Sequence, residues 1–407
     1  MIKREGVKKM GGFSFAAERP IEKYHKSDIL FLISVILLWG LGFFTLFISS
    51  QNYAQRMFND SYYFVKRQFI TSCIGGILFL FFLLSDMKFI RKLVPIIVIS
   101  SFVLCILTFF PGISIEKNGA RRWIRLPMSF SFQPSELVKF SIVLFLANFF
   151  DKQERLVNPD DKNVAPSVVV FIVFLAVVGF QKDFSTTVFI AVVCILMFFV
   201  TGSKMKWLIP FTIVVIPIGV MMILTQKYRL ERILGYINPD SFATTLNFQS
   251  IAAKKAVTAG GIWGSGIGTD LSRINSIPEI QADYIFAGWA EAMGFVGVII
   301  YFVVLCFFAW RGYRSSFMCP DRFASFASFG CVSVIFLQSL LNCMVVCGLV
   351  PSTGIPLPFF SMGGSSIIIT LAMCGFILNT SRCEESYEIN TKSDENNEEI
   401  LTILDFQ

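Results

Sequence analysis

Long apolar runs recur along most of the chain and are separated by short polar segments. A bilayer core is crossed by about 20 apolar residues in helical conformation, and backbone groups in lipid must satisfy their hydrogen bonds internally. The pattern therefore predicts an all-α polytopic membrane protein. We expect ten spans, at roughly 28–49, 67–84, 93–110, 136–150, 166–180, 184–201, 207–224, 284–310, 322–347 and 361–380. The fourth and fifth are short enough to be tilted or partly re-entrant.

Composition agrees with this interpretation, because 55% of the 407 residues are apolar and 46 are phenylalanine. The first apolar run starts late, is long enough to span, and has no small-residue cleavage pattern behind it, so we expect no cleavable signal peptide. Three regions follow: a basic N-terminal segment at 1–27, a ten-helix membrane domain at 28–380, and an acidic tail at 381–407 that is typical of disorder.

Lysine and arginine predict the orientation, since they gather on the cytoplasmic side of membrane proteins. Seven of them lie in the first 27 residues, so the N-terminus is expected in the cytoplasm. Ten spans then place the C-terminus inside as well, and a large extracytoplasmic loop at 225–283 between the seventh and eighth spans. The net charge of +7 is scattered over loops on both faces and does not indicate nucleic-acid binding.

Cysteine and histidine do not form a metal-binding or disulfide pattern. Most of the ten cysteines lie inside expected spans, no CxxC occurs, and His25 is the single histidine. We expect neither a zinc site nor a disulfide framework, and the cysteines to be small packing residues.

Two expected outer segments are basic against the topological rule, the long loop and NGARRWIR at 118–125. FQPSELVK follows the second of these at 132–139, and Glu136 and Lys139 are spaced to share one helical face. Interfacial anchoring is the alternative role, because Trp and Arg favour the headgroup zone. The candidate residues are Asn118, Arg121, Arg122, Trp123, Arg125, Gln133, Ser135, Glu136 and Lys139.

Carboxylates form a second set of candidates at the same expected face. Asp183 lies in the turn between the fifth and sixth spans, and Asp283 lies just before the eighth, four residues after Glu279. A carboxylate beside a cavity with arginines suits a general base near an anionic substrate. Helix N-capping is the alternative for both aspartates.

Two further segments are irregular. The outer loop contains an amphipathic stretch with Ile251, Val257 and Lys254, which suits an interfacial helix, followed by clustered glycines. PSTGIPLPFFSMGGSS at 351–366 breaks the pattern before the last span, and broken backbone at membrane depth is tolerated where it is buried or lines a cavity. Its candidate residues are Ser361, Gly363, Gly364 and Ser365.

NGARRWI with FQPSEL, then PEIQADYIFA, then STGIPLPFFSMGGSS resemble, in the same order, the motifs of the SEDS (shape, elongation, division and sporulation) family, whose members include FtsW and RodA. The resemblance covers most of 28–380. It implies a ten-span glycosyltransferase that polymerises lipid II, the undecaprenyl-pyrophosphate-linked disaccharide-pentapeptide, together with a class B penicillin-binding protein and other division or elongation proteins. It is slightly stronger to the division type.

The resemblance assigns the essential carboxylate to Asp283 and matches the arginine before the tryptophan to Arg122. The sequence departs from the family at Gln281-Ala282, where His-Thr is common, and at Lys182-Asp183, where Pro-Asp is common. We expect Arg121, Arg122 and Arg125 to hold the pyrophosphate, since guanidinium binds phosphate as a fork. Asp183 and Lys254 would support the site. A divalent cation, Mg²⁺ or Mn²⁺, could share the charge, although no clear ligand set is present.

Two other functions fit parts of the pattern. A lipid II flippase or transporter also uses charged cavities and broken helices, but it would place its charges near the midplane rather than at one face. A non-catalytic scaffold of the division machinery would tolerate loss of Asp283.

Overall fold

The computed structural model describes residues 27–117, 119–127, 130–155, 163–202, 219, 236–237, 248–266, 277 and 280–382. The basic N-terminal segment, the acidic tail, and the seventh expected span apart from Gly219 lie outside the described residues. Within them, the chain is mainly helical, as predicted. The helices are α1 (Ile29–Phe58), α2 (Tyr63–Leu84), α3 (Met87–Leu107), α4 (Pro134–Glu154), α5 (Ala165–Phe180), α6 (Phe184–Val200), α9 (Phe248–Ala259), α10 (Ile285–Met318), α11 (Arg322–Cys347) and α12 (Gly364–Ser381).

Six of these helices are long and apolar enough to cross a membrane, namely α1, α2, α3, α10, α11 and α12. Helices α5 and α6 are apolar but shorter. Helix α4 has 21 residues and contains the expected fourth span at 136–150. Its C-terminal end extends beyond the apolar run through Asp151, Lys152 and Glu154, which are charged.

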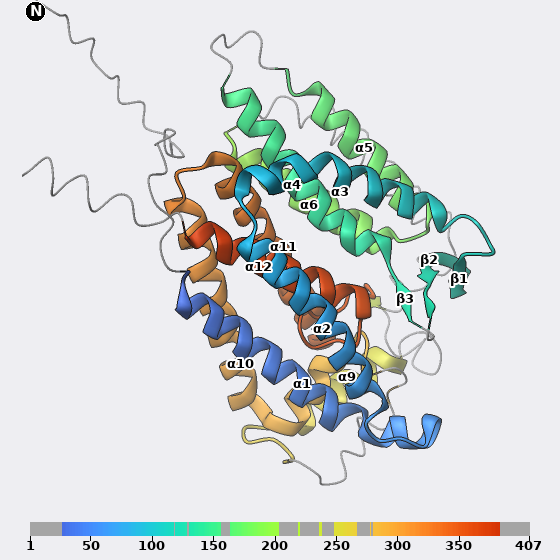
Figure 1. Cartoon of the computed structure of the whole chain (residues 1–407). Coiled ribbons are helices and arrows are strands. Elements are labelled where there is room, and N and C mark those ends of the chain that lie inside the picture. Colours follow the sequence, from blue (N-terminus) through green and yellow to red (C-terminus); the bar gives the residue numbers. More distant parts are fainter. Residues whose placement is uncertain are drawn as a thin grey trace, which may run out of the picture.

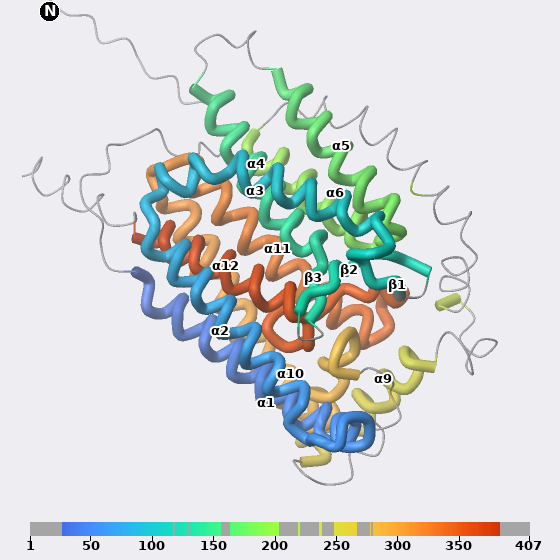
Figure 2. Tube along the Cα trace, turned by 45° about the vertical axis from the view of Figure 1, so that its right-hand side comes forward, coloured from blue at the N-terminus to red at the C-terminus, as the bar shows by residue number. Residues whose placement is uncertain are grey.

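Helices α11 and α12 lie between a group formed by α3–α6 and a group formed by α1, α2 and α10 (Figure 1). In the apolar window of α12, 89% of residues are buried, against 22% for α3, so α12 is central and α3 faces outward. Small residues allow α2 and α12 to run side by side (Figure 2). A Cβ on Gly375 would lie 2.2 Å from the Phe79 carbonyl oxygen, closer than any side chain can approach.

A small antiparallel sheet, which the sequence pattern did not predict, precedes α4. Its strands β1 (Ser114–Lys117), β2 (Ala120–Arg125) and β3 (Ser131–Phe132) pair in that order. Gly119 adopts a φ of +70° in the β1–β2 turn, a conformation that favours glycine. Residues 119–124 of the NGARRWI motif therefore belong to a hairpin, and β3 leads directly into the first turn of α4.

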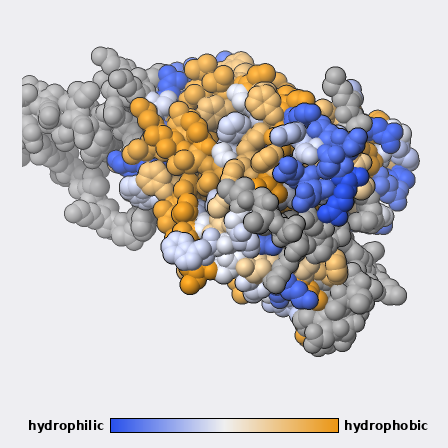
Figure 3. Space-filling view, turned by 90° about the horizontal axis from the view of Figure 1, so that it is seen from below, coloured by the Kyte–Doolittle hydropathy of each residue, from blue (hydrophilic) through white to orange (hydrophobic). Residues whose placement is uncertain are grey.

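The sheet lies at the end of the bundle where α2, α4, α6, α10 and α12 begin, which we call the sheet end. Seen from below, apolar residues cover much of the surface and hydrophilic residues gather towards the right (Figure 3). The opposite end is fastened by ion pairs, including Arg311 with Asp28 at 2.7 Å and Arg91 with the fully buried Asp151. These ion pairs hold together helices that are distant in sequence. The polar groups at the sheet end do not take part in them.

Candidate functional site

A cavity of about 990 Å³ opens within the sheet end. Its wall comes from the first turns of α2 and α6, from β2, from the last turns of α11, and from the irregular segments around Asp283 and at 350–366. Predicted site residues from four separate sequence motifs therefore lie on the wall of one cavity. Those on its wall are Arg122, Trp123, Gln133, Asp283, Gly363, Gly364 and Ser365.

Asp183 binds three polar side chains, one from β2 and two from the start of α4, on one side of this cavity. Its buried carboxylate lies 3.4 Å from Arg122 Nη1, accepts from Gln133 Nε2 at 3.0 Å, and lies 3.5 Å from Ser135 Oγ. The side chain does not cap α6, so the capping alternative for Asp183 is wrong. The pairing holds the guanidinium of Arg122 at the wall, where its Nε is buried without a hydrogen-bond partner among the described residues.

Two further hydrogen bonds join the hairpin to the α5–α6 turn. Arg122 Nη2 donates to the Lys182 carbonyl, and Lys182 Nζ donates to the Gly119 carbonyl at 3.0 Å. Lys182 has a φ of +62°, which is strained for a residue with a Cβ. These two bonds add a second cationic side chain to the cavity wall beside Arg122.

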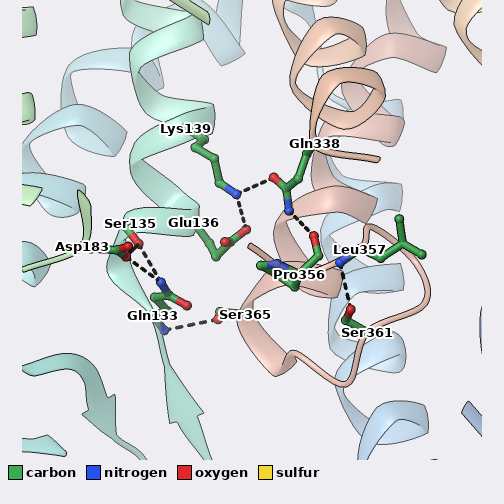
Figure 4. A network of polar contacts seen from close by, with 10 residues as sticks. All are labelled: Gln133, Ser135, Glu136, Lys139, Asp183, Gln338, Pro356, Leu357, Ser361 and Ser365. Atoms are coloured by element: carbon green, nitrogen blue, oxygen red, sulfur yellow. Dashed lines mark hydrogen bonds and ion pairs between the residues drawn. The ribbon is translucent and has the colours of Figure 1, made fainter. Parts of the chain in front are cut away.

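Glu136 and Lys139 form the predicted pair, with 2.8 Å between Lys139 Nζ and Glu136 Oε2 and both side chains buried. Figure 4 shows Lys139 reaching from α4 to Gln338 on α11, which in turn donates to the Pro356 carbonyl at 2.8 Å. Neither Glu136 nor Lys139 lines the cavity. The pair therefore braces α4 against the irregular segment behind the cavity wall.

Asp283 is half-buried and lies on the wall formed with the irregular segment. A Cβ built on Gly354 would lie 3.6 Å from Asp283 Oδ2, so the Gly354 backbone passes close to the carboxylate. Ser361 Oγ donates to the Ala282 carbonyl, and Met362 N donates to the Gln281 carbonyl at 2.8 Å. Tyr284, rather than Asp283, is the N-cap residue of α10 and caps no backbone group.

Sequence reasoning missed a further arginine on the wall. Arg67, in the first turn of α2, stacks over the Phe130 ring at 4.5 Å and donates to Tyr63 Oη at 2.6 Å. An ionisable residue at the start of the expected second span was the available signal, because ionisable residues at membrane depth usually face a cavity or a partner. With Arg67, the wall carries cations from α2, β2 and the α5–α6 turn.

One part of the wall is apolar. It is formed by the start of α6 and the end of α11 with Phe184, Val188, Phe189, Val192, Leu337, Leu341 and Met344. Charged and apolar surfaces therefore meet in a single chamber. That combination suits a ligand with an anionic head and a hydrocarbon chain.

Several predicted site residues lie away from the cavity or outside the described residues. Arg121 pairs with the exposed Glu116 at 3.1 Å, and Arg125 is exposed. Lys254 lies on the predicted outer-loop helix, which is present as α9, but its side chain packs over Gly348 at the end of α11. Ser135 and Ser361 lie behind the wall. Asn118 and Glu279 are outside the described residues.

The described part of the site brings few possible ligands together for a divalent cation. Within the described ranges, no group of three or more His, Cys, Asp or Glu side chains is placed to hold a metal. The carboxylate of Asp183 is already occupied by Arg122 and Gln133.

Comparison with known proteins places the chain among membrane proteins of the bacterial cell cycle. The family model described as FTSW_RODA_SPOVE, cell cycle protein, matches residues 28–386. Stage V sporulation protein E of Bacillus subtilis is 34% identical over 356 residues, 87% of this chain and 97% of that protein. A probable peptidoglycan glycosyltransferase FtsW of Geobacter metallireducens is 33% identical over 363 residues, 89% of this chain and 96% of that protein.

Solved structures share the fold. A chain of the structure "Structural coordination of polymerization and crosslinking by a peptidoglycan synthase complex" is similar with a TM-score of 0.71 and 24% identity, over 88% of this chain and 99% of that one. Rod shape determining protein RodA of Thermus thermophilus has a TM-score of 0.64 and 22% identity, over 88% and 98%. The predicted polytopic helical fold is confirmed by these likenesses.

Proposed function

This chain belongs to the FtsW, RodA and SpoVE family, and we propose that it is a peptidoglycan glycosyltransferase that polymerises lipid II. The observation that carries the proposal is the single cavity in which Asp283 and Arg122 share a wall. Lipid II has a pyrophosphate, sugars and a polyprenyl chain, and the cavity offers cations, a carboxylate and an apolar surface for these parts.

Binding begins at the cationic side. Arg122, with Lys182 beside it and Arg67 on the wall of the same cavity, neutralises the pyrophosphate of the donor. Asp183 and Gln133 keep the Arg122 guanidinium in place, and a planar guanidinium meets phosphate oxygens through two parallel hydrogen bonds. The apolar wall between α6 and α11 takes the start of the lipid chain.

Asp283 acts as the general base. It removes the proton from the 4-hydroxyl of the acceptor N-acetylglucosamine while the hydroxyl oxygen attacks the anomeric carbon of the donor sugar. The new C–O bond forms as the bond to the pyrophosphate breaks, with inversion at that carbon. The electron pair leaves on the polyprenyl pyrophosphate, whose negative charge the arginines stabilise.

The site faces the outer side of the cytoplasmic membrane of a bacterium, with both termini in the cytoplasm. The basic segment before residue 28 supports this orientation through the positive-inside rule. Polymerisation proceeds with a class B penicillin-binding protein, which the similarity to a chain of a peptidoglycan synthase complex supports. Relatives named FtsW and Stage V sporulation protein E favour a role in division or sporulation over elongation.

Replacement of the base tests the chemistry. We expect Asp283→Asn to lower lipid II polymerisation by the purified chain with its transpeptidase partner by about 10²–10⁴-fold, the usual contribution of general base catalysis. Asp60→Asn is the matched control, because Asp60 lies in the α1–α2 turn near the same end, pairs with Lys66, and does not line the cavity. Glycan strands would be measured by gel electrophoresis. Equal activity of the two variants would remove Asp283 from the mechanism.

A further inference from the structure

Asn342 joins the two irregular segments that meet at Asp283. Its side chain lies on α11 and is only 1% exposed. The Nδ2 group donates to the Asp283 carbonyl and to the Ile355 carbonyl, each at 2.9 Å. Neither acceptor lies in a helix or strand. The Asn342 amide therefore links two irregular segments that have no secondary structure of their own at these carbonyls.

The oxygen of the same amide makes no comparable hydrogen bond among the described residues. Asn342 Oδ1 is buried and has no hydrogen-bond partner among the described residues. A buried acceptor without a partner destabilises the fold, so the position uses an asparagine for its two N–H donors alone. That asymmetry points to the two carbonyls as the purpose of the side chain.

The contact acts on the peptide of Asp283 itself. Bonds from Ser361 and Met362 fix the carbonyls of Ala282 and Gln281, which are the residues before it. The Ile355 carbonyl follows Gly354, whose backbone lies beside the Asp283 carboxylate. By holding both carbonyls at once, Asn342 sets the distance between the aspartate and the backbone that covers it.

We propose that Asn342 is a positioning residue that orients Asp283 for catalysis. The proposal rests on the proposed function, because it concerns the base of that reaction. The bonds of Arg122 and Asp183 do not involve Asn342. Its loss therefore misplaces the base and leaves the binding of the pyrophosphate intact.

Asn379 provides a matched control at the other end of the bundle. It is also 1% exposed, and its Nδ2 also donates to two backbone carbonyls, those of Phe82 and Ser85, at 2.7 Å each. Asn342→Ala and Asn379→Ala thus remove the same chemistry at two places. Only one of those places adjoins Asp283.

The experiment measures kcat and KM for lipid II, and thermal unfolding, on the full chain with its transpeptidase partner. We expect Asn342→Ala to lower kcat by about 10–100-fold, as a displacement near 1 Å does, with KM changed less than about twofold. Asn379→Ala is expected to lower the unfolding temperature similarly and to leave kcat within about twofold of wild type.

Asn342→Asp adds a readout that a purely structural role would not move. A protonated carboxyl can donate one of the two bonds, whereas an ionised one donates none and repels both carbonyls. Its kcat is therefore expected to fall relative to wild type as pH rises. Because Asp has nearly the same volume as Asn, an effect of Asn342→Asp on kcat cannot be due to a void in the packing.

The proposal would be overturned by equal kcat losses at Asn342 and Asn379, by a change confined to KM, or by failure of both Asn342 variants to fold while Asn379→Ala folds. The last result would make Asn342 a structural residue only. A wild-type chain that forms no glycan would instead overturn the proposed function. Active wild type with unaffected Asn342 variants would overturn the positioning role alone.

Discussion

At the scale of residues, two adjacent arginines have different surroundings. Successive side chains of a strand point to opposite faces, so Arg121 pairs with Glu116 across the hairpin while Arg122 reaches Asp183 on the α5–α6 turn. The sequence NGARRWI alone does not distinguish the two arginines. Because β2 directs them to opposite faces, Arg122 lies on the cavity wall and Arg121 does not.

Arg122→Lys keeps the charge but loses the planar fork, and Lys is not equivalent to Arg at such a site. We expect KM for lipid II to rise by about tenfold, corresponding to one lost charge-assisted hydrogen bond. Arg121→Lys, in the same strand, is the matched comparison and should change KM less than about twofold. Steady-state polymerisation kinetics measure both values. A larger effect at Arg121 than at Arg122 would refute the assignment.

At the scale of elements, α10 is interrupted at Gly294, where φ is +64° and ψ is −165°. The break removes the helical bonds from Phe295 and Val296 to the carbonyls of Glu291 and Ala292. The segment 260–266 restores all four groups: its Gly261 and Ile262 carbonyls accept from 295 and 296, and its Ser265 and Gly266 N–H groups donate to 291 and 292. Four backbone hydrogen bonds therefore join the segment after α9 to α10, the helix that follows Asp283.

Gly294→Ala tests this junction. An added Cβ would lie 2.3 Å from Gly264 N and 2.6 Å from the Ile262 carbonyl oxygen, and the positive φ is itself strained for alanine. We expect a loss of at least about 1–3 kcal/mol in unfolding free energy. Thermal unfolding in detergent measures the change.

Gly40→Ala on α1 is the control for that substitution, because an added Cβ there meets no atom within 4 Å. It should leave the unfolding temperature unchanged or slightly raised, since alanine favours helix over glycine. An equal loss at both glycines would show that the junction does not depend on the close approach at Gly294.

At the scale of the whole molecule, the apolar pattern predicts the helical bundle. The spacing of Glu136 and Lys139 predicts that they share one helical face, and the two side chains form an ion pair there. The β-hairpin is missed, since its strands are too short to show alternation beside long spans. Asn342 and Gln338 are four residues apart on α11, which indicates a shared face but not the carbonyls that they reach. Those partners come from segments whose placement depends on tertiary structure.

Glycan polymerisation and movement of a lipid across the membrane are the two activities to be told apart. The most direct measurement is polymerisation of lipid II by the purified wild-type chain in liposomes with its transpeptidase partner, with penicillin present so that only glycan formation is followed. We predict glycan strands that lengthen with time. Absence of strands, together with movement of lipid II across the same liposomes, would contradict the glycosyltransferase function and make the cavity a transport site.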